Sequence, residues 1–340
     1  MDFLLEYGLF LAKVVTVALS LVIVMGLLIN LGGRIRKQEG VLEVEKINDT
    51  IEQLGDAVQA AMLGSAERKK LTKQKKKDAK ERLKQASEKT RVFLLAFKGD
   101  LRASAVASLR EEITAVLSQA KPEDEVVVLL ESAGGMVHSY GLAASQLDRI
   151  KKRGIPLTVC VDKIAASGGY MMACVADKIL AAPFSMIGSI GVVAQLPNFN
   201  RLLKKHDVDV ELHTAGEFKR TLTMFGENTD EGREKFIEDI QEIHDLFKDF
   251  VGSHRKNLDI DKIATGQVWL GTRALEESLV DELMTSDEYL VDRSNQADIY
   301  QVSYLHHKSL PEKLGLATEN RVDSLLLRWW NRLCNSRYSV

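Results

Sequence analysis

Residues 125–135 read EVVVLLESAGG, and this stretch indicates the fold class. An uninterrupted apolar run of this length is typical of a strand buried on both faces, as in the parallel sheet of an α/β protein. The paired glycines Gly134 and Gly135 then turn the chain tightly into a helix that we expect over 136–151. The stretch therefore predicts one strand-turn-helix unit.

The same alternation continues on both sides of this unit. Val92–Phe97 and Leu157–Val161 are apolar runs that predict further buried strands, and residues 101–119 have apolar side chains at helical spacing. Residues 179–197 carry no charge, but Pro183, Gly188 and Gly191 interrupt them, together with polar Ser185, Ser189 and Gln195. Two short buried strands therefore fit better there than a membrane span. The predicted fold class is α/β with a largely parallel core.

Two further segments have an apolar stripe at helical spacing. Residues 231–253 predict an amphipathic helix. Residues 321–337 set two tryptophans and several aliphatic side chains against Arg321, Arg328 and Arg332. Such a stripe is typical of a packing or oligomer face, and paired tryptophan with arginine also suits a membrane interface.

The amino-terminal part of the chain predicts a membrane anchor. Residues 14–31 contain no charged side chain, and about 20 apolar residues span the hydrocarbon core of a bilayer. A cleaved signal peptide would begin with basic residues, whereas Asp2 and Glu6 precede this run. The sequence thus predicts a single transmembrane helix that stays in the protein.

A polar segment, residues 38–90, follows the anchor and is expected to be helical. Within it, residues 66–89 hold eleven Lys or Arg against four Asp or Glu. This stretch is either a solvated helix or tether, or a polybasic segment held on anionic lipid. The whole chain has 340 residues and a net charge of −2, which gives no reason to expect nucleic acid as a partner.

The three cysteines, Cys160, Cys174 and Cys334, are odd in number and widely spaced, so we expect free thiols rather than a disulfide framework. No Cys-x-x-Cys or His-Glu-x-x-His spacing occurs, and we predict no metal and no cofactor.

Ser167 is the candidate nucleophile. It lies in Ala-Ala-Ser-Gly-Gly-Tyr (165–170), between small residues at the expected start of a helix, where its hydroxyl is exposed. No histidine is near in sequence, so Lys219 in Gly-Glu-Phe-Lys-Arg (216–220) is the candidate base. A lysine accepts a proton only when it is uncharged. An apolar neighbour such as Phe218 and a nearby cation such as Arg220 both favour this uncharged state. Alternatively, Ser167 is a helix cap and Lys219 a surface lysine.

Acyl transfer also needs backbone N–H groups directed at the developing oxyanion. Gly134, at the turn between a strand and a helix, can present such a donor without a Cβ in the way. The amide of Gly168, directly after the serine, is a second candidate. The order of strand, Gly-Gly turn, strand, serine and lysine is more specific than any single motif.

In that order the motifs resemble peptidase family S49, the signal peptide peptidase A type of Ser-Lys protease. The resemblance covers about 92–285 and rests on short motifs: Ser132-Ala-Gly-Gly135, Ala166-Ser-Gly-Gly-Tyr170, Ala176-Asp-Lys-Ile179, Gly188-Ser-Ile-Gly-Val192, Gly216-Glu-Phe-Lys219, Gly266-Gln-Val-Trp-Leu-Gly271 and Leu279-Val-Asp281. The anchor and polar segment look like the membrane-bound branch of this family.

The resemblance implies a ClpP/crotonase-like α/β spiral domain over 91–290. Residues 1–37 would be the anchor with its flanks, 38–90 a charged helical linker, and 291–340 a tail with an amphipathic helix. It implies Ser167 as nucleophile, Lys219 as general base, and Gly134 and Gly168 as oxyanion donors. It also implies that Gly188, Ser189, Ile190, Gly191 and Val192 pair with an extended peptide substrate.

Family members assemble as rings, so the resemblance also implies a homo-oligomer in which adjacent subunits can contribute the serine and the lysine. The expected location is a bacterial inner membrane, with membrane lipid and peptide or protein substrates as partners. Arg34, Arg36 and Lys37 after the span place the domain in the cytoplasm by the positive-inside rule, whereas better-known relatives act outside it. The sequence leaves the side open.

The chain departs from the family pattern at three positions. Ala133 replaces the proline of the Ser-Pro-Gly-Gly turn, Arg220 replaces a serine after the lysine, and Ser278 replaces a glycine before Leu-Val-Asp.

The main hypothesis is a membrane-anchored serine endopeptidase that cleaves peptides or membrane-associated protein fragments, such as remnant signal peptides. Because Arg220 removes an expected partner of Lys219, a catalytically silent oligomeric membrane scaffold is the alternative. A crotonase-like acyl-CoA enzyme would give Lys219 no role.

Overall fold

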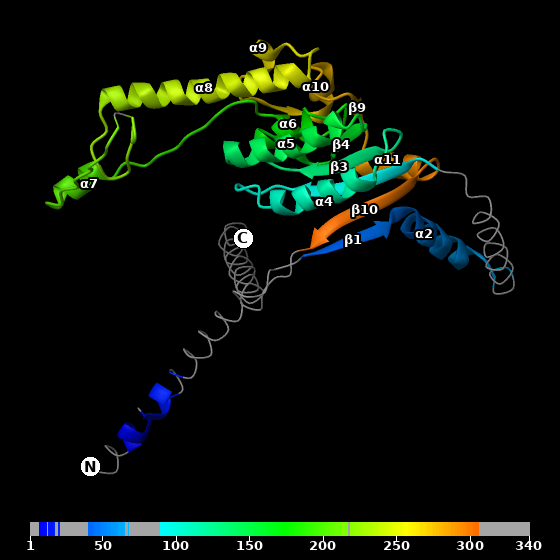
Figure 1. Ribbon diagram of the computed structural model, residues 1–340, viewed down its shortest axis with the longest axis horizontal. Coiled ribbons are helices and arrows are strands. Elements are labelled where there is room, and N and C mark those ends of the chain that lie inside the picture. The colour runs from blue at the N-terminus through cyan, green and yellow to red at the C-terminus, as the bar shows by residue number, and fades with distance from the viewer. Residues whose placement is uncertain are drawn as a thin grey trace, which may run out of the picture. The chain divides into compact units, whose positions relative to one another are not determined.

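The computed structural model describes residues 7–11, 13–17, 20, 40–64, 67, 89–216 and 218–305 (Figure 1). Within these residues no helix combines the length and apolar character needed to cross a bilayer. Most of the apolar run 14–31 lies outside the described residues, as do the basic stretch 68–84, Cys334 and the tail 321–337. Residues 42–304 form one compact unit, to which the following description applies.

A seven-stranded sheet forms the centre of this unit, and five of its neighbouring pairs are parallel. The strand order is β1 (Val41–Lys46), β10 (Asp298–Leu305), β2 (Arg91–Lys98), β3 (Glu125–Glu131), β4 (Leu157–Val161), β6 (Lys178–Ala181) and β9 (Glu282–Leu283). The three predicted apolar strands are confirmed as β2, β3 and β4, and the α/β fold class with them. The central residues of these strands are apolar because both faces of the sheet are covered there, whereas charged residues stand at the ends of β2 and β3.

Alternate residues of each strand enter different cores, since side chains of a strand point to opposite faces. Phe93, Leu95 and Phe97 of β2 pack with the helices α4 (Val106–Gln119) and α5 (Val137–Lys152). Val92 and Leu94 pack on the other face with Leu290 of α11 (Ser286–Ser294) and Ile47 of α2 (Ile47–Met62). The helices expected over 101–119 and 136–151 are thus confirmed.

The start of the polar segment is a strand, which corrects the expectation of a helix over its whole length. Residues 41–46 read VLEVEK and form the edge strand β1 next to β10. The side chain of Asn48 secures this edge, because it donates to Ser294 O and Ala297 O and accepts from the Ile299 N–H. The sheet therefore includes strands from outside the 91–290 segment that the sequence assigned to the protease domain.

A second sheet of three strands lies beside the first. It consists of β5 (Ile164–Ala166), β7 (Met186–Gly188) and β8 (Val268–Leu270), with β5 parallel and β8 antiparallel to β7. β6 and β7 confirm that 179–197 contains two short strands joined by turns. Ser132, directly after β3, bridges to Ala165 of β5 and so joins the two sheets.

A long excursion separates β7 from β8. It begins with an arm, which we define as residues 193–229, containing α7 (Asn200–Lys205), and returns along α8 (Asp230–His254). Two short helices, α9 (Ile260–Ile263) and α10 (Gly271–Glu276), complete the unit. α8 confirms the helix predicted over 231–253, although Phe247 and Val251 are its only fully buried residues. Figure 1 shows α7 and the amino-terminal end of α8 away from the sheets.

One ion pair fastens the carboxyl end of α8 to the body. Arg255 donates to both carboxylate oxygens of Asp281, at 2.9 and 2.8 Å, and to Ser278 O. Asp281 also accepts the N–H of Ile179 at 2.7 Å. The guanidinium is largely buried, and this desolvation lowers the pKa of Arg255. The hydrogen bonds to Asp281 and the negative charge nearby together outweigh it, so that the pKa of Arg255 is raised.

Replacing Arg255 tests this attachment. Arg255→Ala leaves a half-buried carboxylate without its cation, so we expect the free energy of unfolding to fall by about 1.5–3 kcal/mol. The measurement is urea unfolding of the purified full chain, followed by circular dichroism. Arg273→Ala is the matched control, because Arg273 pairs with Glu276 on the surface. Equal unfolding midpoints for the two variants would contradict the assignment.

Candidate active site

Ser167 lies at the turn from β5 into α6 (Gly168–Ala173). Its backbone has φ 51° and ψ −119°, a sparsely populated conformation for a residue with a side chain. A strained serine at a strand-to-helix turn is the geometry of a nucleophile elbow, which exposes the hydroxyl. The Ser167 side chain makes no capping hydrogen bond to α6, so the helix-cap alternative is not supported.

Main-chain hydrogen bonds hold the elbow from two sides. The Ser167 N–H donates to Gly188 O at 2.7 Å, which ties the elbow to the end of β7. The Ala166 N–H donates to Ser132 O at 3.0 Å, and the Ser132 N–H donates to Ile164 O at 2.8 Å. The strained residue is therefore fixed by its neighbours rather than by its own side chain.

The glycines around Ser167 are needed because backbone segments approach each other closely. A Cβ on Gly134 would lie 2.8 Å from Ala166 O, Gly168 N and Ser167 Cβ, and Gly134 has φ +89°. A Cβ on Gly168 would lie 2.4 Å from the Tyr140 ring, and one on Gly169 would lie 2.4 Å from Ser132 O. The Gly-Gly turn thus contacts Ser167 directly.

The backbone donors near Ser167 differ in availability. The Gly134 N–H donates to Ser132 Oγ at 3.1 Å, so it is already engaged. Across the described part of the chain, no hydrogen bond engages the N–H of Gly135 or of Gly168, the first residue of α6. The first N–H groups of a helix have no partner within that helix and are suited to bind an anion. Gly168 and Gly135 therefore have the open N–H groups.

The predicted substrate segment, Gly188–Val192, continues from the elbow. The Ser189 N–H donates to Gln267 O at 2.7 Å, and Ile190 O accepts the Gly266 N–H at 3.0 Å, so one edge of the segment is paired. Ile190 is buried and Gly191 and Val192 are half-buried, whereas Val193 is 91% exposed.

Lys219 is not brought to Ser167 within the chain. It is exposed on the arm, and two contacts place its neighbours at the amino-terminal end of α8. Lys235 Nζ lies 5.7 Å from the Phe218 ring, and Thr221 O would be 2.4 Å from a Cβ on Gly232.

Ser167 lies toward the other end of α8. Phe247 and Val251 are the α8 residues that pack in the core with Tyr170 and Met171 of α6. From Asp230 to Phe247 the helix advances by seventeen residue steps, or about 25 Å at 1.5 Å per step. The structure thus joins Ser167, Gly134, Gly168 and Gly188 in one place and leaves Lys219 apart.

A buried hydroxyl cluster behind the Gly-Gly turn was not predicted. Ser132 Oγ lies 2.6 Å from the hydroxyl oxygen of Tyr140, which donates to Asp100 O at 2.8 Å. Burial raises the pKa of Tyr140, which keeps its proton in place. Helical spacing could place Tyr140 on the buried face of its helix, but no sequence signal indicates which atoms its hydroxyl meets.

The described residues also include two cysteines and other residue types that can act as metal ligands. Cys160 and Cys174 are buried free thiols, as expected, and burial raises the pKa of Cys160 to about 12. Within the described ranges, no group of three or more His, Cys, Asp or Glu residues could hold a metal ion.

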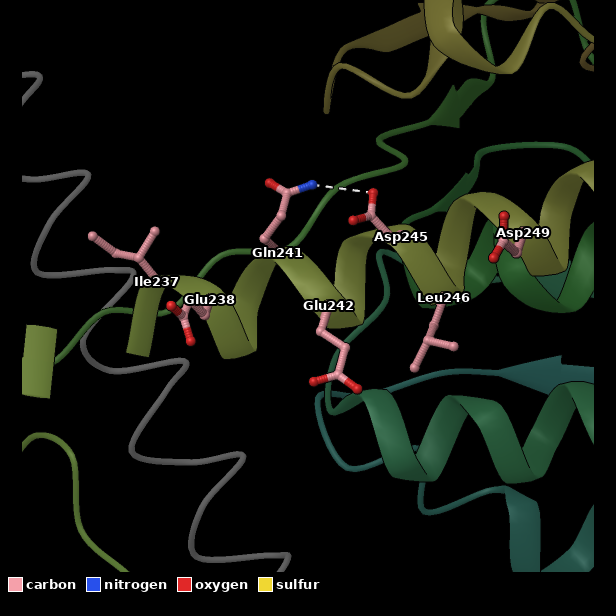
Figure 2. Close-up of a pocket in the computed structure, with 7 residues that line it drawn as sticks. All are labelled: Ile237, Glu238, Gln241, Glu242, Asp245, Leu246 and Asp249. Atoms are coloured by element: carbon pink, nitrogen blue, oxygen red, sulfur yellow. Dashed lines mark hydrogen bonds between the residues drawn. The ribbon is translucent and has the colours of Figure 1, made fainter. Parts of the chain in front are cut away.

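A shallow hollow runs along α8, and Ser167 does not line it. Figure 2 shows its lining, in which the Gln241 side chain donates to Asp245 Oδ1 at 3.1 Å. The lining residues are acidic, amide or aliphatic: Ile237, Glu238, Gln241, Glu242, Asp245, Leu246 and Asp249. None belongs to the nucleophile cluster, but they give this helix an exposed acidic face.

Comparison with known families agrees with this geometry. A model of the amino-terminal part of peptidase family S49 matches residues 2–147, and the S49 peptidase model matches residues 149–299. The chain belongs to peptidase family S49, and its α/β fold is consistent with a ClpP-like protease domain. It is therefore a peptidase by family.

Its relatives carry matching names. The chain is 47% identical over 340 residues to the "Probable protease SohB" of Haemophilus influenzae, covering 96% of each chain. It is 48% identical over 305 residues to the "Probable protease SohB" of Buchnera aphidicola subsp. Schlechtendalia chinensis, covering 86% of this chain and all of that protein. A more distant relative is the "Putative signal peptide peptidase SppA" of Enterococcus faecium, 29% identical over 194 residues, 55% of this chain and 56% of the other.

The close approach at Gly134 predicts that this position tolerates no side chain. Gly134→Ala would push the elbow backbone aside, and we expect peptidase activity to fall by at least about 100-fold, since small displacements of reacting groups have effects of this size. Activity is measured on a fluorogenic peptide. In the control variant Gly154→Ala, φ is also positive at +70°, but nothing lies within 4 Å of the new Cβ. A Gly134→Ala enzyme as active as Gly154→Ala would contradict the packing argument.

Proposed function

We propose that the protein is a membrane-anchored serine endopeptidase whose catalytic dyad is Ser167 and Lys219. The observation that carries the proposal is the strained serine at the β5–α6 elbow, with open N–H groups beside it, in a chain of family S49.

The mechanism follows from the positions of these groups. Ser167 Oγ attacks the peptide carbonyl while Lys219 Nζ accepts the hydroxyl proton and then delivers it to the leaving amine. The Gly168 N–H holds the oxyanion together with an N–H of the Gly-Gly turn. For the turn we favour Gly135 over the predicted Gly134, because the Gly134 N–H already donates to Ser132. Water, activated by Lys219, then hydrolyses the acyl-enzyme.

The dyad is proposed to form between neighbouring copies of the chain. Lys219 and Ser167 lie toward opposite ends of α8, so Lys219 would reach the Ser167 of an adjacent subunit in a homo-oligomeric ring. The arm supports such an assembly, since exposed apolar side chains gather on it: Val193, Phe199, Leu202, Val208, Leu212, Phe218 and Phe225. Arg201 and Lys205 on the arm are also complementary in charge to the acidic face of α8.

The substrate is proposed to be an extended peptide or a membrane-associated protein fragment. Residues 188–192 run from the elbow with one edge paired, and the other edge would add a substrate strand by main-chain hydrogen bonds. Remnant signal peptides fit this class, as the name of the Enterococcus faecium relative suggests for that protein. The apolar run 14–31 would hold the enzyme in a bacterial inner membrane near such fragments.

A catalytically silent scaffold is the alternative, because Arg220 stands where the family has a serine. A fluorophosphonate reagent separates the two proposals. Covalent labelling of Ser167, lost in Ser167→Ala, supports the peptidase, whereas a folded protein that is never labelled supports the scaffold.

Mixing two inactive variants tests the shared dyad. We expect Ser167→Ala and Lys219→Ala each to reduce peptide cleavage at least about 1000-fold. Co-expressed in equal amounts, they should regain about a quarter of wild-type activity, the fraction of interfaces that join an intact serine to an intact lysine. A dyad formed within one chain would give no recovery, and either single variant at wild-type activity would refute the dyad.

The anchor gives a separate prediction. The full chain is expected to stay with membranes washed in alkaline carbonate, because about 20 apolar residues remain in the bilayer. A variant that lacks residues 1–37 should appear in the wash, as detected by immunoblotting. Release of the full chain would contradict the anchor, and protease access to a carboxyl-terminal tag in spheroplasts would establish which side the domain faces.

A further inference from the structure

A chain of hydrogen bonds runs from the Gly-Gly turn into the protein interior. The Gly134 N–H donates to Ser132 Oγ at 3.1 Å, Ser132 Oγ lies 2.6 Å from the Tyr140 hydroxyl, and that hydroxyl donates to Asp100 O at 2.8 Å. Ser132 is 1% exposed and Tyr140 is fully buried. These hydroxyls therefore have no water to replace a lost partner.

The donor and acceptor in each of these hydrogen bonds can be assigned from the number of protons that each group carries. A carbonyl oxygen carries no hydrogen, so the Tyr140 proton is committed to Asp100 O. The Ser132 hydroxyl must then donate to Tyr140 and accept from the Gly134 N–H. All three hydrogen bonds point the same way, an arrangement in which each bond strengthens the next.

The hydrogen-bonded chain ends at Asp100, and this residue lies in a turn that is itself held by hydrogen bonds. The Asp100 carboxylate accepts the N–H groups of Arg102 and Ser104 and the Ser104 hydroxyl, which fixes a turn over 100–104. The same turn supports the Gly-Gly segment from outside, because Leu101 O accepts the Met136 N–H at 2.9 Å. The hydroxyl chain thus ends on a rigid support.

Both hydroxyl residues also contact the nucleophile elbow. The Tyr140 ring packs against Gly168, and Ser132 O accepts the Ala166 N–H and lies against Gly169. Gly99 leaves room for the two hydroxyls, since a Cβ there would lie 2.3 Å from Ser132 Oγ and 2.4 Å from the Tyr140 hydroxyl oxygen. The pair therefore touches both parts of the active site.

We propose that Ser132 and Tyr140 are positioning residues for peptide cleavage, in that their hydroxyl chain fixes the orientation of the Gly-Gly turn and its open amide relative to Ser167. The inference rests on the proposed function. In this proposal the hydroxyl chain binds the Gly134 N–H, so that the neighbouring Gly135 N–H is held toward the place where the oxyanion develops. Neither hydroxyl touches substrate.

The experiment uses the full chain in detergent or liposomes and two variants that remove one oxygen each, Tyr140→Phe and Ser132→Ala. The kcat per site, counted by exhaustive labelling with a fluorophosphonate, should fall about 10- to 100-fold in each variant, because misplaced groups lose this much rate. The KM should change less than about threefold, since ground-state binding is untouched. The double variant should be no slower than the slower single one, because both hydroxyls act through one chain.

An inhibitor pair gives a readout that a purely structural role would not move. A peptidyl boronic acid forms a tetrahedral adduct with the serine hydroxyl and places an oxygen where the oxyanion would be. Its affinity should weaken by the same factor as kcat/KM, while the affinity for the cleaved product peptide stays constant. Equal weakening of both ligands would overturn the proposal.

Two matched controls remove similar groups elsewhere. Ser185 is also 1% exposed and its hydroxyl donates to Ala182 O, and the Tyr289 hydroxyl donates to Glu125 at 2.5 Å. Ser185→Ala and Tyr289→Phe should lower the thermal midpoint about as much as the test variants and leave kcat unchanged. If Tyr140→Phe keeps kcat within about threefold of wild type, or if the controls lose as much rate, the proposal is wrong.

The outcome is separable from that of the proposed function. Wild-type cleavage by Ser167→Ala would overturn the peptidase mechanism, whatever the hydroxyl variants do. Loss of cleavage in Ser167→Ala, with full kcat in Tyr140→Phe and Ser132→Ala, would overturn the positioning role alone. Because kcat is counted per labelled site, a variant that folds poorly still reports on its folded fraction.

Discussion

The two main-chain hydrogen bonds between Ser132 and β5 are the interaction on which the site depends. Through them the end of β3, in the large sheet, is joined to the strand that ends at Ser167, in the small sheet. A parallel bridge of this kind fixes how the segment at Ser132 is aligned along β5, in the same way that register aligns two strands of one sheet. The Gly-Gly turn and the turn at Ser167, 33 residues apart from Gly134 to Ser167, are therefore held in contact by these backbone hydrogen bonds, to which the side-chain hydroxyls of Ser132 and Tyr140 add their own.

Much of the fold could be predicted because it rests on local patterns. β3 and β4 are continuous apolar runs, and their bounds follow almost directly from the sequence. β1 was missed for a physical reason: an edge strand is half exposed, so its mixture of valine, leucine and glutamate also fits a surface helix. Only the pairing with β10, some 250 residues later, selects the strand.

The site was predictable to a different extent at each residue. Glycine content and order pointed to Ser167, Gly134 and Gly168, since close backbone approach leaves a visible mark on composition. The hydroxyl chain left no such mark, because Tyr140 satisfies the helical pattern equally well whether or not its oxygen meets Ser132. The family resemblance allowed for Lys219 and Ser167 to come from different subunits, but the residues themselves did not show that the two are apart within the chain, since this depends on the path of the arm and on the length of α8.

The length of α8 has a consequence for control of the enzyme. If each site takes its lysine from a neighbouring copy, as proposed, a newly made chain carries no complete catalytic site. Proteolytic capacity would then rise more steeply than the amount of protein, because it would follow the number of assembled interfaces. Such an enzyme would be latent at low density, and the 25-residue helix α8 would act as the spacer that keeps it so.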